Sequence, residues 1–129
     1  MGTANTYVFV KDSQVIAYYS LAAHQLQSDE PPNRLAHGAP LAIPAYLIGK
    51  LAVTKEMQNQ MIGGALLIDA LLRLSRASEG GPSARIITVD AIDDGAVNFY
   101  RKNHFVSSPT DQKQMFMRMS TARKIVTRG

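Results

Sequence analysis

The sequence predicts a single mixed α/β domain over residues 1–129, with a β-hairpin near its start and a central pair of parallel strands. The first observation is two β-branched and aromatic runs, residues 6–10 and 15–23, separated by a short polar turn. The second is a helical apolar pattern over residues 60–77 that stands between two strand-like apolar runs. A helix that connects two strands in this way makes them parallel, with a right-handed crossover.

The first half of the chain is predicted to contain three strands. Residues 6–10 and 15–23 should pair as a hairpin. Residues 24–40 contain three prolines and a glycine and keep no periodicity, so a long loop is expected there. Residues 45–53 are apolar almost throughout, which predicts a third strand buried on both faces. Lys50 is the exception within this strand and would have to reach an edge of the sheet or a ligand.

The second half begins with the helix over residues 60–77, which a glycine–glycine–proline sequence ends. The remaining predicted elements are a strand over 85–91, a helix from Asp93 or Asp94 to Lys102, a final strand over 114–119, and a basic tail over 120–129 that is expected to fray.

Composition narrows the functional classes. The chain has no cysteine, which excludes disulfides, cysteine-ligated zinc and a thiol nucleophile. No apolar run reaches the roughly 18 residues of a membrane span, and no signal peptide is recognisable, so a cytoplasmic protein without a membrane partner is expected. The three histidines have no metal-ligand spacing, so no metal is assigned. The net charge of +4 and the pI of about 9.6 allow an anionic partner or simply a basic surface.

The segment between the third strand and the long helix is a candidate anion site. A strand, a polar hinge and a helix that begins near Gly63 and Gly64 follow one another directly. The first N–H groups of a helix lack partners within the helix, and the helix dipole favours negative charge at that end. A pyrophosphate would suit this position, although the same arrangement is also a common packing unit.

Two short motifs, at residues 58–63 and 97–105, fall on the predicted hinge and on the predicted second helix. Gln58 and Gly63 match the first and last positions of an acetyl-CoA signature, whereas Met61 stands in place of its central glycine and Asn59 where glycine is frequent. Residues 97–105 hold a Phe-Tyr helix whose closing Gly-Phe has become His104-Phe105. Together these motifs resemble the GCN5-related N-acetyltransferase (GNAT) family, over the chain from Thr6 to Met119.

The resemblance implies a GNAT-like, mostly antiparallel sheet with a central parallel β-α-β acetyl-CoA unit. It implies that Tyr100 is the general acid that protonates the departing coenzyme thiolate. Asp90 is a weaker candidate for a general base, with a helix-capping or structural role as the alternative. The implied acetyl-CoA contacts are Leu51, Ala52, Val53, Gln58, Asn59, Gln60, Met61, Ile62, Gly63, Gly64, Ala65 and Asn98.

Residues 15–23, 43–45 and 89–92, with the later Pro109, look like the toxin branch of this family. Members of that branch acetylate the amino group of aminoacyl-tRNA and are held in check by an antitoxin. The family usually has a strand and two helices before the strand that begins here at Thr6. With five residues in that place, the chain is expected to be an N-terminally shortened domain, either a fragment or a natural short form.

Alternatives remain open at this stage. The chain could acetylate another small-molecule or protein amine, or it could be a non-catalytic GNAT-like binding module, and a homodimer is also possible. The Met61 side chain could crowd the pyrophosphate, in which case glycine there would improve coenzyme binding. A nucleic-acid face could include some basic residues, although each is more readily explained as solvated charge: Arg34, Lys50, Arg73, Arg76, Arg101, Lys102 and Arg123.

Overall fold

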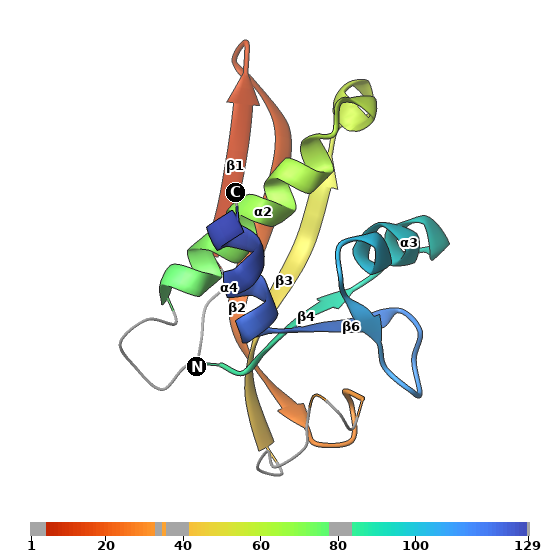
Figure 1. The fold of residues 1–129 in the computed structure, drawn as a ribbon. Helices are drawn as coiled ribbons and strands as arrows, with labels where there is room; N and C mark the ends of the chain where they lie inside the picture. Colours follow the sequence, from red (N-terminus) through yellow and green to blue (C-terminus); the bar gives the residue numbers. More distant parts are fainter. Residues whose placement is uncertain (1–4, 33–34, 36–41, 78–83, 129) are drawn as a thin grey trace.

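The fold is a six-stranded sheet with its helices arranged around the central strands (Figure 1). The computed structural model describes residues 5–32, 35, 42–77 and 84–128. In chain order the elements are β1 (Asn5–Lys11), β2 (Gln14–Gln27), β3 (Ala42–Val53), the 3-10 helix η1 (Lys55–Gln60), α2 (Ile62–Ala77), β4 (Ile86–Asp90), α3 (Asp94–Lys102), β5 (Val106–Ser107), β6 (Gln114–Arg118) and α4 (Met119–Arg128).

The sheet is antiparallel except at its centre. Its strand order is β1-β2-β3-β4-β6-β5, and only β3 and β4 run parallel within it. The helix α2 makes the crossover between these two strands, as the sequence predicts. Their pairing ends where Ile48 lies opposite Val89, although β3 continues to Val53. The two strands therefore separate at their carboxyl ends, and Figure 1 shows this divergence.

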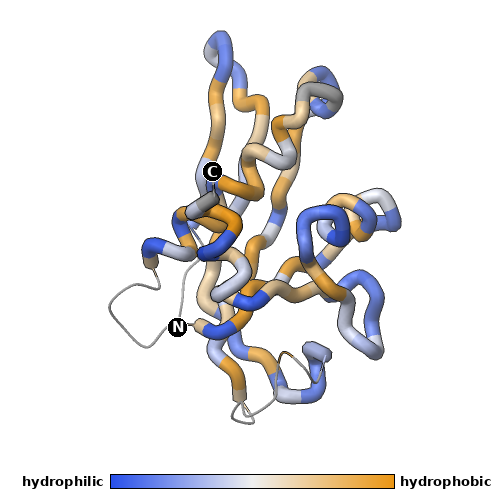
Figure 2. Tube along the Cα trace, in the orientation of Figure 1, coloured by the Kyte–Doolittle hydropathy of each residue, from blue (hydrophilic) through white to orange (hydrophobic). Residues whose placement is uncertain are grey.

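Alternating residues place the larger core on one face of the sheet. Ile87 and Val89 of β4 and Met115 and Met117 of β6 are buried in the same cluster as the apolar stripe of α2. Ile86, just before Ile87, and Phe116, between Met115 and Met117, belong to a smaller cluster on the opposite face. Figure 2 shows the hydrophobic colour along the central strands and α2, and hydrophilic residues at the tip of the β1–β2 hairpin. No helix in the described ranges is long and apolar enough to cross a membrane.

A polar cluster fixes α2 to the β1–β2 side of the sheet. The fully buried Tyr19 donates a hydrogen bond from its hydroxyl to Asp69 Oδ2 at 2.5 Å. Arg73 Nε donates to the same hydroxyl at 2.9 Å and lies 3.2 Å from Asp69 Oδ2. The Arg73 guanidinium also lies over the ring of Tyr7, 4.1 Å from its centroid. Burial and then the Asp69 hydrogen bond raise the pKa of Tyr19, so the hydroxyl stays protonated and keeps its donor role.

Several predicted boundaries require correction. β2 extends to Gln27, so the first four residues of the predicted loop are strand, because β3 pairs with them from Gln27 opposite Ala42 onward. β3 begins at Ala42 rather than Ala45. The long helix begins at Ile62 rather than Gln60, because the hinge before it is wound as η1. The rest of the predicted loop lies largely outside the described residues.

The described part of the basic tail, which the sequence predicts to fray, forms α4 up to Arg128. Met119 and Ala122 are buried, and Ile125 and Val126 are half-buried against the main core. These positions form an apolar stripe at helical spacing. Through this stripe α4 packs against α2 and adds to the main core. The charges therefore lie on the solvent side of a docked helix.

Candidate active site at the divergence of β3 and β4

A pocket of about 660 Å³ opens where β3 and β4 separate. Its size is that of a typical small-molecule site. In sheets with parallel strands, ligands bind in the crevice beyond the carboxyl ends of diverging strands. The pocket is lined by Tyr18, Ile48, Lys50, Leu51, Ala52, Val53, Gln58, Gly63, Asp90, Ile92, Gly95, Ala96, Phe99 and Tyr100. The N-terminal turns of α2 and α3 thus face the same space as the free end of β3.

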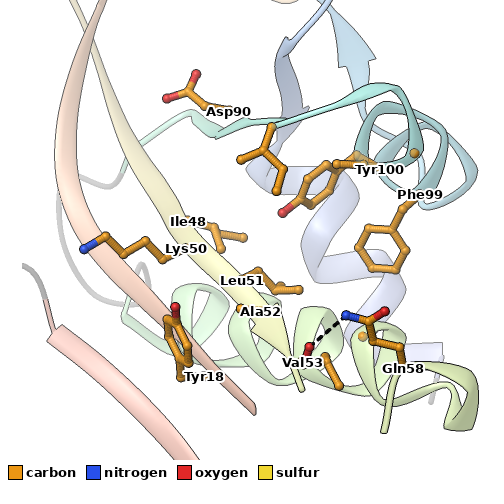
Figure 3. Close-up of a pocket in the computed structure, with 14 residues that line it drawn as sticks. Tyr18, Ile48, Lys50, Leu51, Ala52, Val53, Gln58, Asp90, Phe99 and Tyr100 are labelled. Atoms are coloured by element: carbon orange, nitrogen blue, oxygen red, sulfur yellow. Dashed lines mark hydrogen bonds between the residues drawn. The ribbon is translucent and has the colours of Figure 1, made fainter. Parts of the chain in front are cut away.

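An irregularity in β3 shapes one wall of the pocket. The register with β2 shifts between Tyr18 and Ser20, and Ser20 Oγ donates to the carbonyl oxygen of Gly49 at 2.9 Å. Lys50 follows in the left-handed region, with φ of 50°, and its side chain is exposed at the pocket. A bulge of this kind bends the strand and redirects side chains. It leaves Lys50 exposed at the rim of the pocket, with its ammonium directed away from Tyr100 in Figure 3.

The hinge between β3 and α2 is held by Gln58. Its Nε2 donates to the carbonyl oxygen of Val53 at 3.0 Å, as the dashed line in Figure 3 shows. Met61 then reverses the chain between η1 and α2 in the left-handed conformation, with φ of 59° and ψ of 20°. Its side chain is 87% exposed, so it does not fill the pocket. The glycine of the resemblance falls at a position whose backbone conformation favours glycine.

The start of α2 is open toward the pocket. Gly63 lines it, and a Cβ atom on Gly63 would lie 3.6 Å from the ring of Phe99. A Cβ atom on Gly64 would meet nothing within 4 Å. The first N–H groups of this helix are available to an anion, because they have no partner within the helix.

The helix α3 carries Tyr100 and has capping hydrogen bonds at both ends. At its start Asp93 Oδ1 accepts a hydrogen bond from Ala96 N at 2.8 Å. At its end Phe105 N donates to Tyr100 O at 3.0 Å and His104 N to Arg101 O at 3.2 Å, which is the hydrogen-bond pattern of a Schellman motif. His104 adopts φ of 74°. The second missing glycine thus also falls at a left-handed position.

Tyr100 is buried but presents its hydroxyl to the pocket. The ring is 6% exposed and lies between Phe99 and Phe105, with centroids 5.2 and 5.4 Å away. Figure 3 shows its hydroxyl pointing into the pocket toward the free end of β3. Burial, followed by the nearby charge of Asp90, raises the pKa of Tyr100 to about 12. The phenol is therefore protonated at neutral pH and can act as a proton donor.

The chain is 31% identical over 125 residues to a tRNA-acetylating toxin of Mycobacterium tuberculosis (strain ATCC 25618 / H37Rv). The match covers 97% of this chain and 75% of that protein. The chain belongs to the GNAT family of tRNA-acetylating toxins. No protein-family model matches it.

Solved structures of GNAT toxins share the fold. A tyrosine-to-phenylalanine mutant of KacT superposes with a TM-score of 0.82 at 18% identity, covering 96% of this chain and 75% of its own. AtaT complexed with acetyl-methionyl-tRNAfMet gives 0.81 at 20% identity, covering 95% and 75%. An AtaT mutant bound to the C-terminus of the antitoxin AtaR and acetyl-CoA gives 0.73 at 22% identity, covering 88% and 65%. The GNAT-like mixed sheet with its parallel pair is thus the fold of this chain.

The residues that the GNAT resemblance indicates are partly brought together. Tyr100 and five of the predicted coenzyme contacts line the pocket, namely Leu51, Ala52, Val53, Gln58 and Gly63. Met61 points to solvent, and Asn98 is exposed and lies outside the pocket lining. Ile62 and Gly64 are half-buried and Ala65 is exposed in the first turn of α2, and Asn59 and Gln60 belong to η1.

Other pocket residues were not predicted from the motifs. Tyr18 comes from β2, and Gly95, Ala96 and Phe99 come from the same helix as Tyr100. The small residues Gly95 and Ala96 in the first turn of α3 could have indicated the pocket from the sequence, because small side chains leave room beside it. Tyr18 offered no local signal, since its place depends on strand pairing. The residue that caps α3 is Asp93 and not Asp90, and Asp90 lines the pocket instead.

Proposed function

We propose that this chain is an acetyltransferase that binds acetyl-CoA in the β3–β4 pocket and transfers the acetyl group to the amino group of an aminoacyl-tRNA. The observation that best supports this proposal is that the Tyr100 hydroxyl faces a pocket bounded by the free end of β3 and the N-terminus of α2. Membership of the GNAT toxin family supports the same activity, and its relatives include structures with acetyl-CoA and with acetyl-methionyl-tRNAfMet.

The residues of the pocket fit acetyl-CoA. Beyond Ile48 the β3 backbone has no β4 partner, so its polar groups on that side, apart from the Val53 carbonyl that accepts from Gln58, are available to an extended, amide-bearing chain. The first N–H groups of α2 and the helix dipole suit a pyrophosphate, and Gly63 keeps side-chain bulk out of that region. Leu51, Ala52, Val53 and the Gln58–Gly64 turn would hold the coenzyme, and the exposed Met61 would not block it.

Tyr100 supplies the proton that the reaction needs. Acetyl-CoA, when bound, supplies a thioester whose C–S bond breaks as the C–N bond to the acceptor amine forms. The Tyr100 hydroxyl donates its proton to the departing sulfur, the amine nitrogen releases a proton to solvent, and the phenolate regains a proton from water. The chain uses no covalent nucleophile, which agrees with the absence of cysteine.

Two further parts of the proposal follow from the acceptor. Because aminoacyl-tRNA is a cytoplasmic substrate, we place the protein in the cytoplasm. Because the activity would block translation, we propose that an antitoxin binds this chain, as the antitoxin AtaR binds AtaT.

Transfer of labelled acetyl groups tests the proposal. The purified chain is incubated with [¹⁴C]acetyl-CoA and bulk aminoacyl-tRNA, and acid-precipitable label is expected on charged tRNA but not on deacylated tRNA. Acetyl-CoA binding in calorimetry without any labelling of tRNA would favour a different amine acceptor. A lack of both heat and thermal shift at millimolar acetyl-CoA would favour a non-catalytic binding module.

A further inference from the structure

The two charged side chains of the pocket lining, Lys50 and Asp90, lie toward one end. In Figure 3 the charged residues Lys50 and Asp90 lie on the side of the pocket where β3 and β4 part, with the β3 ribbon between them, whereas Gln58 and Phe99 lie on the side of the hinge. The second side is the one that suits the coenzyme, because it contains the hinge and the start of α2. The first side is therefore left for the acceptor, and Tyr100 lies between the two.

Asp90 is the anionic group at this acceptor end. It is the last residue of β4, one position beyond the Ile48–Val89 pair where the parallel strands part. Asp90 is exposed and lines the pocket, and its charge is close enough to Tyr100 to act on that group electrostatically, although its carboxylate points away from the Tyr100 hydroxyl in Figure 3. Among the described residues it forms neither an ion pair nor a helix cap. Neither of these structural roles therefore accounts for the Asp90 side chain.

We propose that Asp90 binds the α-amino group of the acceptor and holds it beside the Tyr100 hydroxyl. This inference rests on the proposed function, because it concerns the acceptor of that reaction. An aminoacyl ester presents one ammonium or amino group, which a carboxylate recognises by a charge-assisted hydrogen bond. The same carboxylate stabilises the positive charge that develops on the nitrogen as the C–N bond forms. Asp90 is then an acceptor-binding residue, and no proton needs to reside on it.

Binding of an aminoacyl-nucleoside tests this without any turnover. Puromycin carries a free α-amino group on a stable amide, and N-acetylpuromycin lacks that charge. We expect Asp90→Asn to weaken puromycin binding about 10- to 100-fold in NMR titrations, with little change for N-acetylpuromycin. Asp94→Asn is the matched control, because it removes the same charge from an exposed residue outside the pocket lining. Equal puromycin affinity in the wild type and Asp90→Asn, or absence of binding by the wild type, would overturn the assignment.

The kinetic readout separates this proposal from the proposed function. With [¹⁴C]acetyl-CoA, Asp90→Asn should lower kcat/KM for aminoacyl-tRNA about 10- to 100-fold while the Kd for acetyl-CoA stays unchanged. Wild-type transfer with an unaffected Asp90→Asn variant refutes only the role of Asp90. Puromycin binding that depends on Asp90 without any wild-type transfer refutes only the acetyltransferase.

Discussion

At the scale of single residues, Tyr100 combines three properties that a general acid needs. Its ring is fixed between Phe99 and Phe105, its hydroxyl faces the pocket, and its pKa is raised to about 12 by burial and then by Asp90. A raised pKa makes the phenol a weaker acid but ensures that the proton is present at neutral pH. A thiol has a pKa of about 8.5, so proton transfer from this phenol to a departing thiolate is uphill and has to be driven by release of the amine proton in the same reaction.

Tyr100→Phe should lower kcat about 10²- to 10⁴-fold and leave the affinity for acetyl-CoA nearly unchanged. Only the hydroxyl is removed, so the ring contacts with Phe99 and Phe105 remain. Steady-state transfer to aminoacyl-tRNA and calorimetry with acetyl-CoA measure the two effects. A mutant that turns over at the wild-type rate would reduce Tyr100 to a packing residue.

Met61 and His104 explain why the family motifs contain glycine at these positions. Both residues adopt positive φ, of 59° and 74°, which side chains with a Cβ atom rarely do. Met61→Gly and His104→Gly should therefore each raise the free energy of unfolding by about 1 kcal/mol. Urea denaturation measures the gain. Met61→Ala and His104→Ala are matched controls, since alanine removes the side chain but keeps the strain, and a similar gain with alanine would contradict the backbone explanation.

Met61→Gly also tests whether the Met61 side chain crowds the coenzyme. Because that side chain is 87% exposed, acetyl-CoA affinity should change less than about twofold while stability rises. Calorimetry with acetyl-CoA decides between this expectation and the crowding hypothesis, which requires clearly tighter binding in the glycine variant.

At the scale of elements, α3 is a short helix whose ends are determined by specific hydrogen bonds. Asp93 accepts from Ala96 N at its start, and the Schellman motif at His104 and Phe105 closes it next to Tyr100. A helix of nine residues is marginal on its own, so these caps and the packing of Val97 and Tyr100 set its position. The position of Tyr100 at the pocket therefore depends on residues such as Asp93 and Val97, which do not line the pocket.

Asp93→Ala should lower the free energy of unfolding by about 1 kcal/mol, because Ala96 N loses its capping acceptor. Urea denaturation followed by circular dichroism measures the loss. Asp94→Ala is the control, because Asp94 belongs to the first turn and makes only the weaker interaction with the helix dipole, worth a few tenths of a kcal/mol. Equal losses in the two variants would show that charge, and not the cap, is responsible.

At the scale of the whole molecule, two buried tyrosines link stability to alkaline pH. The pKa values of Tyr19 and Tyr100 are both raised in the folded protein, chiefly by burial. Below about pH 10 both the folded and the unfolded states keep these protons. As the pH rises from about 10 toward 12, the unfolded state loses the Tyr100 proton while the folded state retains it, so the free energy of unfolding falls.

The Tyr100 contribution should appear as a slope of about 1.4 kcal/mol per pH unit between about pH 10 and 12. The measurement is the free energy of unfolding as a function of pH, compared between the wild type and Tyr100→Phe. The mutant should show a shallower decline, and Tyr19→Phe a further difference of the same sign. Parallel curves would mean that neither phenol is perturbed by the fold.

Local patterns in the sequence determined much of this protein. The apolar period over residues 60–77, the β-branched and aromatic runs of the first two strands and the cap at Asp93 or Asp94 correspond to observed elements, because each depends mainly on residues within one element. The paired motifs also pointed to Tyr100 and to Gln58 and Gly63 of the β3–α2 hinge, which line the same pocket. These features are local because helix periodicity, capping and strand alternation are properties of neighbouring residues.

Tertiary structure alone decided the rest. The extension of β2 to Gln27 requires pairing with Ala42, and the ordering of the basic C-terminal segment requires α2 as a surface for α4. The positions of Tyr18, Lys50 and Asp90 around one pocket depend on where two parallel strands stop pairing. These outcomes could not be predicted locally, because their energies come from contacts between residues far apart in the chain. Such contacts form only once the sheet is assembled.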